Sequence, residues 1–569
     1  MERYMRKNFV QIAAFLLALL IIPGTVASAE PVEGGSNPAE VAQADLAFGG
    51  DDVRVGLYYG SDALPGANLL NSVGTGYRFG YDDGAGFCQL GITAETAISM
   101  VKTQNVYYVR FSDGLSGYTD QSTSNIVVGC YHIGLPGRYA TFEEAKAAAV
   151  SVGGFPAWIK GEFQVRIGAY ASEGAAESAL QSLGVADASV VGTSSYGITV
   201  VKTGTAAPIF QFDGGTENAM LIVKPGMDDS VKTITHFKKR QYYGSFRYER
   251  IEGGNLTVVN LVSMDDYVRG ILPYEMSSSW PLEALKAQAV CARSYTVTNM
   301  DAHRHSSSHF DICTTTHCQV YKGTESANAN TDRAVEETAG QYAWYDGKVI
   351  EAYYHSSDGG ATENIENVWN EELPYLRGVL DPYEALIENE IPSYHWTRTY
   401  TGRELKEMVA AYDYNCSDIV DIKVSKLTDT GNVYSVTFTD KNGKSWTVTK
   451  DKRLRSMFGT KSLRYTITPG GDGYSLTNDQ SLGALNGAWA LDGEGNPVKV
   501  NVTTVYALTG NGVEEVKAPE NTDGTFTFSG TGSGHNLGLS QWGAYSMAKQ
   551  GYTYEEILKF YYTGIEIHE

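Results

Sequence analysis

One carboxylate stands in a setting that suits acid–base chemistry. Glu275 lies in the segment Pro273–Met276 (PYEM), just ahead of a helix that is expected to open at Pro281. The residues around it, among them Trp280, are largely apolar or aromatic. A partly apolar pocket disfavours the charged form of a carboxyl group and raises its pKa toward neutrality, as a general acid requires. These neighbours would suit an acid role for Glu275, although a glutamate in such a loop, taken alone, is more often a solvated surface residue.

The expected helix carries further polar residues near this carboxylate. Apolar and small residues recur every three or four positions from 282 to 296, which predicts one buried stripe. Lys286 and Arg293 are seven positions apart and share a face away from that stripe. A cation close to Glu275 would lower its pKa, so at least one of the two should lie farther off. Arg293 has the alternative of a structural ion pair.

A second group of residues has the composition of a metal site. The segment 303–319 (HRHSSSHFDICTTTHCQ) holds three histidines and then Cys313, His317 and Cys318. Two sulfurs and two imidazoles form a tetrahedral Zn²⁺ set, with His309 preferred to His305 as the fourth ligand. With four protein ligands the zinc would have no open position and would be structural. The alternative is a Cys313–Cys318 disulfide in an oxidising compartment.

The pattern of helices and strands expected along the chain predicts an α+β multidomain protein. Residues 1–29 have a positive flank, an apolar run and a small-residue cleavage site, which indicates a signal peptide and hence a secreted protein. The alternative is retention by an N-terminal membrane anchor. Residues 30–125 read as a linker and a β-rich module, and 126–204 as a βαββαβ module closed by a strand at 196–202. Residues 225–566 predict a large mixed α/β domain with a β-rich second half.

The net charge bears on the partners of the protein, and the cysteine content bears on its disulfides. The 569 residues carry a net charge of −22, which disfavours nucleic acid because phosphate binding needs a basic surface. Six cysteines in an exported chain invite disulfides, and Cys88 and Cys130 could pair. Cys291 falls in the helical pattern and is expected to be a buried thiol.

Two stretches resemble known families. FQVRIGAYASEGAAESALQSL (163–183) resembles a SPOR domain, a module that binds peptidoglycan glycan strands; a generic α+β linker domain is the alternative. The segment 261–295 strongly resembles the stage II sporulation protein D and amidase enhancer family, and four further segments agree in order. These are DICTTTHCQVYKG (311–323), YHSSDGGATENIENVW (354–369), YLRGVLDP (375–382) and the region 532–564, so the resemblance covers about 225–566.

The resemblance implies a lytic transglycosylase that cuts peptidoglycan glycan strands stripped of their peptides. Glu275 matches the family's catalytic glutamate, acting first as acid and then as base, so that a 1,6-anhydro-muramic product forms. The candidates for substrate binding are Lys286, Gln288, Arg293, Tyr295, His355, Ser356, His535, Ser540 and Gln541. The Cys/His zinc is also known among members of the family and is thought to be structural there.

Two positions depart from the family pattern, and three other functions stay open. Asp358 and Asn536 stand where the family more often has a small hydroxyl residue and a glycine. Asp358 adds a carboxylate near the expected site, which keeps a two-carboxylate hydrolase open. The main alternative is a non-catalytic glycan-binding enhancer of a cell-wall amidase. A zinc amidase is weaker, because the Cys/His set leaves no evident open metal position.

Overall fold

The computed structural model describes residues 52–369, 371–470 and 524–569, and between 470 and 524 only six short strands. Those strands pair as β29 (Ser475–Leu476) with β30 (Gln480–Ser481), β31 (Trp489–Leu491) with β32 (Pro497–Lys499), and β33 (Val505–Thr509) with β34 (Gly512–Val516). The predicted signal peptide, residues 1–29, lies outside the described residues. Within the described part of the chain, no helix has the length and apolar character needed to cross a membrane.

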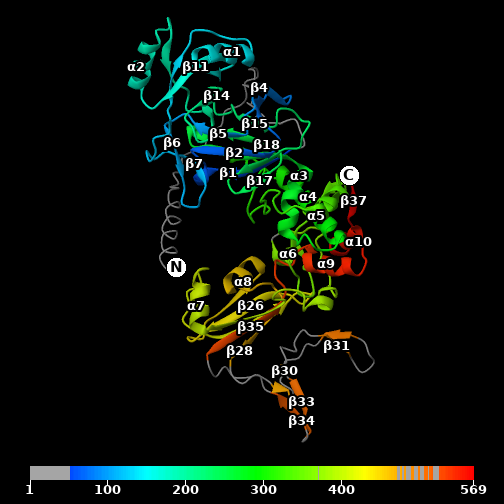
Figure 1. Ribbon diagram of the computed structural model, residues 1–569. Coiled ribbons are helices and arrows are strands. Elements are labelled where there is room, and N and C mark those ends of the chain that lie inside the picture. The colour runs from blue at the N-terminus through cyan, green and yellow to red at the C-terminus, as the bar shows by residue number, and fades with distance from the viewer. Residues whose placement is uncertain are drawn as a thin grey trace, which may run out of the picture. The chain divides into compact units, whose positions relative to one another are not determined.

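A seven-stranded sheet joins the start of the described chain to its centre (Figure 1). Its strand order is β20-β1-β19-β18-β15-β3-β4. The strands are β1 (Asp52–Tyr58), β3 (Tyr77–Asp82), β4 (Phe87–Thr93), β15 (Leu221–Pro225), β18 (Ser245–Glu249), β19 (Thr257–Ser263) and β20 (Ile312–Cys313). β1 pairs antiparallel with β19 and parallel with β20. This sheet crosses the predicted boundaries, because it contains strands from both 30–125 and 225–566.

A ten-stranded sheet contains the segment that was expected to form a βαββαβ module. Its order is β12-β9-β11-β10-β14-β13-β5-β2-β16-β17. The strands are β2 (Gly66–Val73), β5 (Ala97–Lys102), β9 (Tyr131–Gly134), β10 (Phe155–Ile159), β11 (Glu162–Tyr170), β12 (Ser189–Val191), β13 (Ile198–Lys202), β14 (Pro208–Asp213), β16 (Ile234–Phe237) and β17 (Arg240–Tyr242). A smaller sheet holds β6 (Val106–Arg110), β7 (Ser116–Thr119) and β8 (Val127–Val128).

From β9 to β12 the elements run β9, α1 (Phe142–Val152), β10, β11, α2 (Glu173–Leu183) and β12. Thr141 and Ser172 cap the two helices with their side-chain oxygens, and glycines in the left-handed conformation follow both helices. The strand at 196–202 was expected to close this segment, and that expectation is wrong. β12 pairs with β9, whereas β13 pairs with β5 and β14.

A cluster of helices surrounds the long helix α4 (Leu282–Asp301). α3 (Met264–Glu275), α5 (Ala329–Glu336), α9 (Gln541–Lys549) and α10 (Tyr554–Tyr561) all pack against α4 (Figure 1). Twelve of its twenty residues are buried, so the prediction of one buried stripe was too narrow. The small sheet of β21 (Tyr342–Tyr345), β22 (Lys348–Val349) and β37 (Glu566–His568) also contacts α4 through β21.

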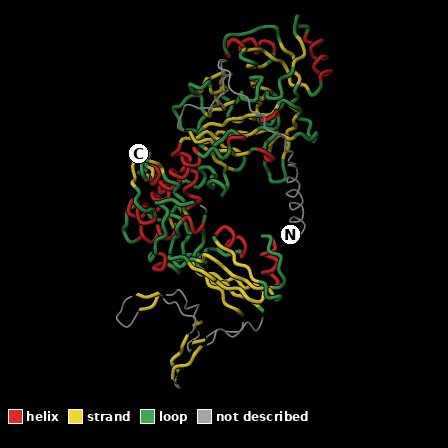
Figure 2. The backbone as a smooth tube through the Cα atoms, turned by 180° about the vertical axis from the view of Figure 1, so that it is seen from behind, coloured by secondary structure: helices red, strands yellow, loops and turns green. Residues whose placement is uncertain are grey.

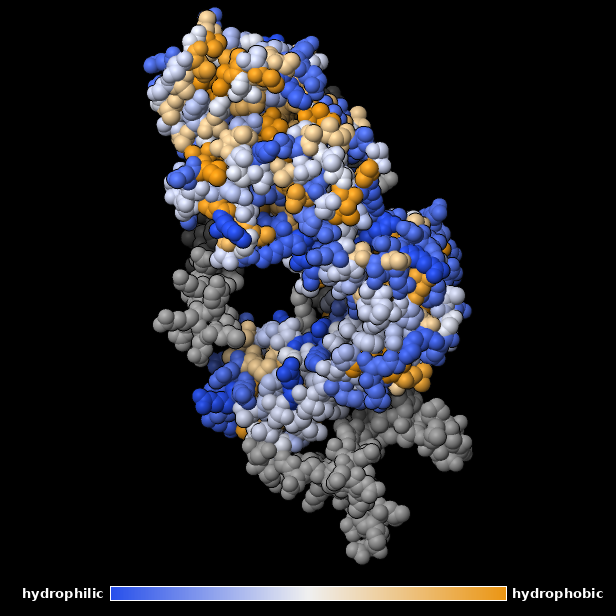
Figure 3. All heavy atoms as spheres, in the orientation of Figure 1, coloured by the Kyte–Doolittle hydropathy of each residue, from blue (hydrophilic) through white to orange (hydrophobic). Residues whose placement is uncertain are grey.

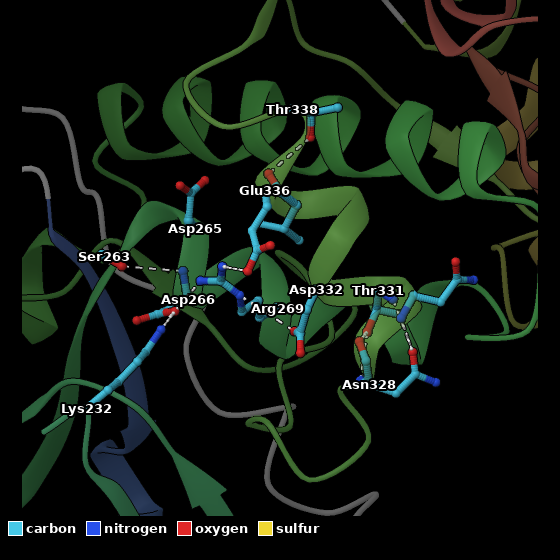
Figure 4. Close-up of polar contacts among 12 residues, drawn as sticks. Lys232, Ser263, Asp265, Asp266, Arg269, Asn328, Thr331, Asp332, Glu336 and Thr338 are labelled. Atoms are coloured by element: carbon cyan, nitrogen blue, oxygen red, sulfur yellow. Dashed lines mark hydrogen bonds and ion pairs between the residues drawn. The ribbon is translucent and has the colours of Figure 1, made fainter.

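A polar network fixes α3 to its neighbours (Figure 4). The hydroxyl of Ser263 caps the helix by accepting from the Asp266 amide. Arg269 reaches Asp266 at 2.6 Å, and contacts Asp332 and Glu336 of α5 at 3.6 and 3.3 Å. These pairs tie the start of α3 to α5, and so orient the helix whose last residue is Glu275.

The β-rich second half of the large domain is present as expected. One sheet has the order β24 (His395–Thr401), β35 (Thr525–Thr531), β28 (Tyr465–Pro469), and another β25 (Ile419–Leu427), β26 (Val433–Asp440), β27 (Ser445–Thr449). Helices α6 (Ile365–Val368), α7 (Gly402–Ala410) and α8 (Asp451–Phe458) accompany them, and β23 (Tyr354–His355) pairs in parallel with β36 (Leu539–Ser540). Figure 2 separates strands from helices, and Figure 3 shows a largely hydrophilic surface over the helical cluster.

Candidate active site

A cavity of about 790 Å³ lies beside the end of α3, and its size is typical of ligand sites. It is lined by Glu275, Tyr295, Arg304, Thr316, His317, Cys318, Gln319, Val320, Tyr353, Tyr354, Trp369, Arg455, Ser456, Thr460 and His535. Glu275 is the one carboxylate in this lining, as far as the described residues show. The lining combines this acid with aromatic rings and two arginines, a composition that suits a polar substrate with sugar-like faces.

Glu275 is the last residue of α3, not a loop residue as the sequence suggested. Pro273 lies inside the final turn and has no backbone N–H, which marks the end of the helix. Burial raises the pKa of Glu275 above its usual value. Hydrogen bonds from Tyr354, Gln541 and the Val320 amide, and the charge of Lys322, act in the opposite direction. The carboxyl group is thus both desolvated and well oriented, as an acid that later becomes a base must be.

Tyr354 is held in place beside Glu275 by Gln319. The Gln319 side-chain amide donates to the Tyr354 hydroxyl at 3.4 Å, while its carbonyl accepts from Thr296 at 2.8 Å and Tyr267 at 3.2 Å. Burial raises the pKa of Tyr354 well above its usual value, so the phenol stays protonated. The result is a neutral donor fixed toward the carboxylate. Sequence reasoning did not single out Gln319 or Tyr354, although both lie within the quoted family segments.

The two predicted histidines lie together, and one of them borders the cavity. The rings of His355 and His535 are 5.4 Å apart, and His535 also lies against Trp369 and Tyr353. Burial lowers the pKa of His535 to about 4 and that of His355 well below its usual value. Both imidazoles are therefore neutral near pH 7. His535 accepts from the Leu537 amide through Nδ1, so it braces the cavity wall.

Gln541 and Gln288 form a pair behind Glu275. The side-chain amide of Gln541 donates to the Gln288 carbonyl at 3.3 Å, and Gln541 also bonds to Glu275. Gln288 is fully buried and does not line the cavity. The predicted substrate contact of Gln288 is therefore corrected to a supporting contact. Gln541 is the first residue of α9, which the Ser540 hydroxyl caps.

Lys286 and Arg293 do not reach the cavity. Lys286 pairs with Glu283 at 2.8 Å and Glu337 at 2.5 Å. Arg293 is fully buried and pairs with Asp265 at 2.9 Å, which confirms the structural alternative. The face of α4 that carries both residues is covered, because α5 and its neighbours pack there. Of the predicted residues of α4, only Tyr295 lines the cavity.

Three more predicted residues lie outside the cavity lining. Ser356 is exposed, and its carbonyl accepts from the Trp542 amide at 3.1 Å. Ser540 donates its hydroxyl to Glu384 in a buried carboxylate cluster that also contains Asp358 and Asp381. Asp358 is fully buried in that cluster and absent from the cavity lining, so the two-carboxylate hydrolase loses its second carboxylate.

The buried carboxylate cluster holds the loop of His355 to α9. Glu384 accepts from Ser357 at 2.7 Å and from Ser540, and Asp381 accepts from Tyr561 at 2.6 Å. Burial raises the pKa of Asp358 well above its usual value, and the charges of Glu384 and Asp381 act in the same direction. Burial and the charge of Asp381 likewise raise the pKa of Glu384. Asn536 lies in the left-handed conformation with φ 62°, which asparagine tolerates.

Four Cys and His side chains gather at one wall of the cavity. They are His305, Cys313, His317 and Cys318, whose ligand atoms all lie within 4.8 Å of one another. His305 takes the place predicted for His309. His309 has φ 58° and bonds through Nδ1 to Glu249 at 2.8 Å, so its ring is turned to another partner. Cys318 and His317 also line the cavity, next to Gln319 and Val320.

The spacing of these atoms suits tetrahedral zinc. With Zn–S near 2.3 Å and Zn–N near 2.0 Å, tetrahedral angles place nitrogen and sulfur about 3.5 Å apart. The His305 Nε2–Cys318 Sγ, His317 Nδ1–Cys318 Sγ and His317 Nδ1–Cys313 Sγ distances are 3.3, 3.4 and 3.8 Å. Hydrogen bonds with the Cys318 thiol and the Thr315 hydroxyl lower the pKa of the Cys313 thiol, which favours the thiolate form that binds zinc. The donor set therefore fits Zn²⁺.

The cysteines form no disulfide. All six are free thiols, including the pair Cys313 and Cys318 and the suggested pair Cys88 and Cys130. Cys291 is buried in α4 as expected, with its sulfur 3.3 Å from the Tyr562 hydroxyl.

Part of this site lies in a segment that matches a known protein family. The family described as Stage II sporulation protein (SpoIID) matches residues 252–345, which contain α3, α4 and the Cys/His group. A 330-residue alignment with an uncharacterized protein of Brachyspira hyodysenteriae has 32% identity and covers 58% of this chain and 72% of that protein. The chain belongs to the stage II sporulation protein D family.

Two named proteins of Bacillus subtilis are also similar to this chain. The amidase enhancer of Bacillus subtilis is 30% identical over 312 residues, covering 52% of this chain and 39% of that protein. Stage II sporulation protein D of Bacillus subtilis is 28% identical over 330 residues, covering 55% of this chain and 77% of that protein.

Proposed function

We propose that this protein is a peptidoglycan lytic transglycosylase that cleaves glycan strands, preferably strands stripped of their stem peptides. The observation that carries the proposal is the single carboxylate in the described lining of the main cavity, Glu275, with a raised pKa. A hydrolase of the common type needs two carboxylates. A lytic transglycosylase needs one, because the second nucleophile belongs to the substrate.

The reaction uses Glu275 twice. The protonated carboxyl group gives its proton to the glycosidic oxygen while the bond from that oxygen to C1 of the muramic acid breaks. The C6 hydroxyl of the same sugar then bonds to C1 and gives its proton to the Glu275 carboxylate. The products are a shortened strand with a free hydroxyl and a 1,6-anhydro-muramic end. Glu275 ends protonated, and no water is consumed.

The neighbours of Glu275 support each half of the reaction. Tyr354 and Gln541 donate to the carboxylate form that exists between the two proton transfers. Burial favours the protonated form at the start and the end. The aromatic rings of Tyr295, Tyr353 and Trp369 offer faces for sugar rings.

We also propose that His305, Cys313, His317 and Cys318 bind a structural Zn²⁺. When bound, the ion would hold the segment 313–318 against the segment at His305, and this chain's own residues would do the chemistry. Gln319 and Val320 follow directly, and both act on Glu275, the first through Tyr354 and the second through its amide. Residues 126–204 would add a SPOR-like glycan-binding module, supported by the β-α-β-β-α-β order of the elements from β9 to β12. Export through the signal peptide would place the protein in the cell wall.

The experiment is mass spectrometry of amidase-stripped glycan strands incubated with the purified chain and with Glu275→Gln. We expect anhydro-muramic ends from the wild type, and a loss of about 10²–10⁴-fold in Glu275→Gln. Glu325→Gln, an exposed carboxylate outside the cavity lining, is the matched control. Reducing ends in place of anhydro ends would contradict the proposal.

A second function has one observation in its favour, namely the 30% identity to an amidase enhancer. In that case the chain binds glycan and activates a cell-wall amidase without cleaving strands itself. The two functions separate when a cell-wall amidase is added to sacculi. An enhancer raises peptide release equally well with wild type and Glu275→Gln, whereas a transglycosylase produces anhydro ends without the amidase.

A further inference from the structure

A second cavity of about 660 Å³ lies next to the first. It is lined by Val368, Trp369, Tyr414, Thr447, Val448, Thr449, Lys450 and Arg453. Trp369 borders both cavities, so one indole separates the space beside Glu275 from the space beside β27 and α8. A strand of linked sugars that fills the first cavity could continue past this ring into the second.

Helix α8 forms a shared wall of the two cavities. Its residue Arg453 lines the second cavity, while Arg455 and Ser456 line the first. Leu454 and Phe458 of the same helix are fully buried, which fixes the helix in position. Arg453 is exposed and forms no ion pair with the described residues. Its guanidinium is therefore available to a ligand.

The charge of the two linings is opposite to that of the chain. Arg304, Arg455, Lys450 and Arg453 line them, against the single carboxylate of Glu275 in their described lining. The whole chain carries −22. A positive groove with aromatic rings on an acidic protein fits a sugar polymer that carries anionic groups. Guanidinium groups in particular match the geometry of carboxylates.

We infer that the second cavity is a distal subsite that binds a muramic acid with a free lactyl carboxylate, and that Arg453 contacts this carboxylate. The inference rests on the proposed function and extends it along the strand. A stem peptide converts the lactyl carboxylate into an amide and removes its charge. The subsite would therefore favour strands without peptides at a position away from the scissile bond.

The test measures binding with Glu275→Gln as the background, so that cleavage does not interfere. The ligands are peptide-free glycan oligosaccharides, the same oligosaccharides with the carboxyl groups reduced to alcohols, and chitooligosaccharides. Arg453→Gln should weaken binding of the native oligosaccharide about tenfold, as expected for one lost charge-assisted hydrogen bond. It should leave the affinity for the reduced oligosaccharide unchanged. Arg403→Gln, with 80% of its side chain exposed on α7, should change neither.

Each possible result has a distinct meaning. Equal losses for native and reduced oligosaccharides, or no loss at all, would overturn the carboxylate subsite while leaving the transglycosylase in place. Competition by a glycerol-phosphate polymer but not by the native oligosaccharide would assign the cavity to phosphate and also overturn it. With Glu275 intact, Arg453→Gln should raise KM for native strands at unchanged kcat. Absence of glycan binding by every variant would instead remove the proposed function itself.

Discussion

Gln319 donates its side-chain amide to the hydroxyl of Tyr354 at 3.4 Å, and Gln319 directly follows Cys318 in the sequence. The same glutamine accepts hydrogen bonds from Thr296 of α4 and Tyr267 of α3. One buried amide therefore links the Cys/His group, two helices and the tyrosine that bonds to Glu275. A substitution at any of these places should change the orientation or the pKa of the Glu275 carboxyl group.

Tyr354→Phe should lower kcat and move the pH profile. The phenol donates to Glu275 and lowers its pKa, so its loss leaves the carboxylate form with one donor fewer. We expect kcat to fall about tenfold, the effect of one lost hydrogen bond in the transition state. Initial rates on peptide-free strands across pH give both readouts. Tyr345→Phe, a half-buried tyrosine outside the cavity lining, serves as control, and an equal loss there would point to general destabilisation.

The pH dependence of activity should follow the raised pKa of Glu275. The acid must start protonated, so kcat should decline as pH rises through that pKa. The charge of Lys322 lowers this pKa, and Lys322→Met should therefore move the decline to higher pH. Lys348→Met, an exposed lysine on β22, should leave the profile in place. A shift to lower pH in Lys322→Met would contradict the assignment of Glu275 as the acid.

The two histidines near the Cys/His group should behave differently toward zinc. His305→Ala removes one of the four gathered ligands, whereas His309→Ala removes a partner of Glu249. Elemental analysis should find about one zinc per chain in the wild type and in His309→Ala, and much less in His305→Ala. Chelation should lower the thermal midpoint of the wild type and reduce its activity, because the segment before Gln319 loses its anchor. Zinc loss in His309→Ala alone would restore the prediction made from sequence.

The buried carboxylate cluster should make stability depend on pH. The pKa of Asp358 is raised in the folded chain, so the stability that its neutral form contributes is present at low pH and is lost as pH rises through the raised value. Asp358→Asn should remove part of this decline and raise the thermal midpoint at neutral pH. Thermal unfolding from pH 4 to 9 measures it, with the exposed Asp429→Asn as control. A midpoint that rises with pH in the wild type and not in Asp358→Asn would reverse the conclusion.

Predictions from sequence were more accurate for Glu275 and the Cys/His group than for the residues around them. Glu275 and the Cys/His group stand in short segments, and the structure brings both to the same cavity. The sequence around Asn442 and Gly443 likewise indicates a hairpin, and β26 and β27 form one there. Local spacing suffices for such features, because the residues that decide them are neighbours in the chain.

The errors arose where distant segments decide the environment. Helical periodicity placed Lys286 and Arg293 on a free face, but α5 and its neighbours cover α4 there. His309 was preferred to His305, whereas the ring of His309 bonds to Glu249 of β18, which is distant in sequence. Trp369 and Arg455, which border the cavity, lie in separate segments, and no spacing rule joins them to Glu275.

The first described strand bears on how the cavity is assembled in time. β1 lies between β19 and β20, and the Arg54 amide bonds to the Asp311 carboxylate across 257 positions of sequence. Contacts between such distant residues form slowly, because the entropy cost of closing a long loop comes before the contact contributes any stabilising free energy. Cys313 of the Cys/His group lies in β20, which pairs with β1, so the group is complete only after this pairing of distant segments has formed. Activity should thus be among the last properties that a refolding chain regains, and a fragment beginning at residue 225 would keep Glu275 and yet leave both strand edges unpaired.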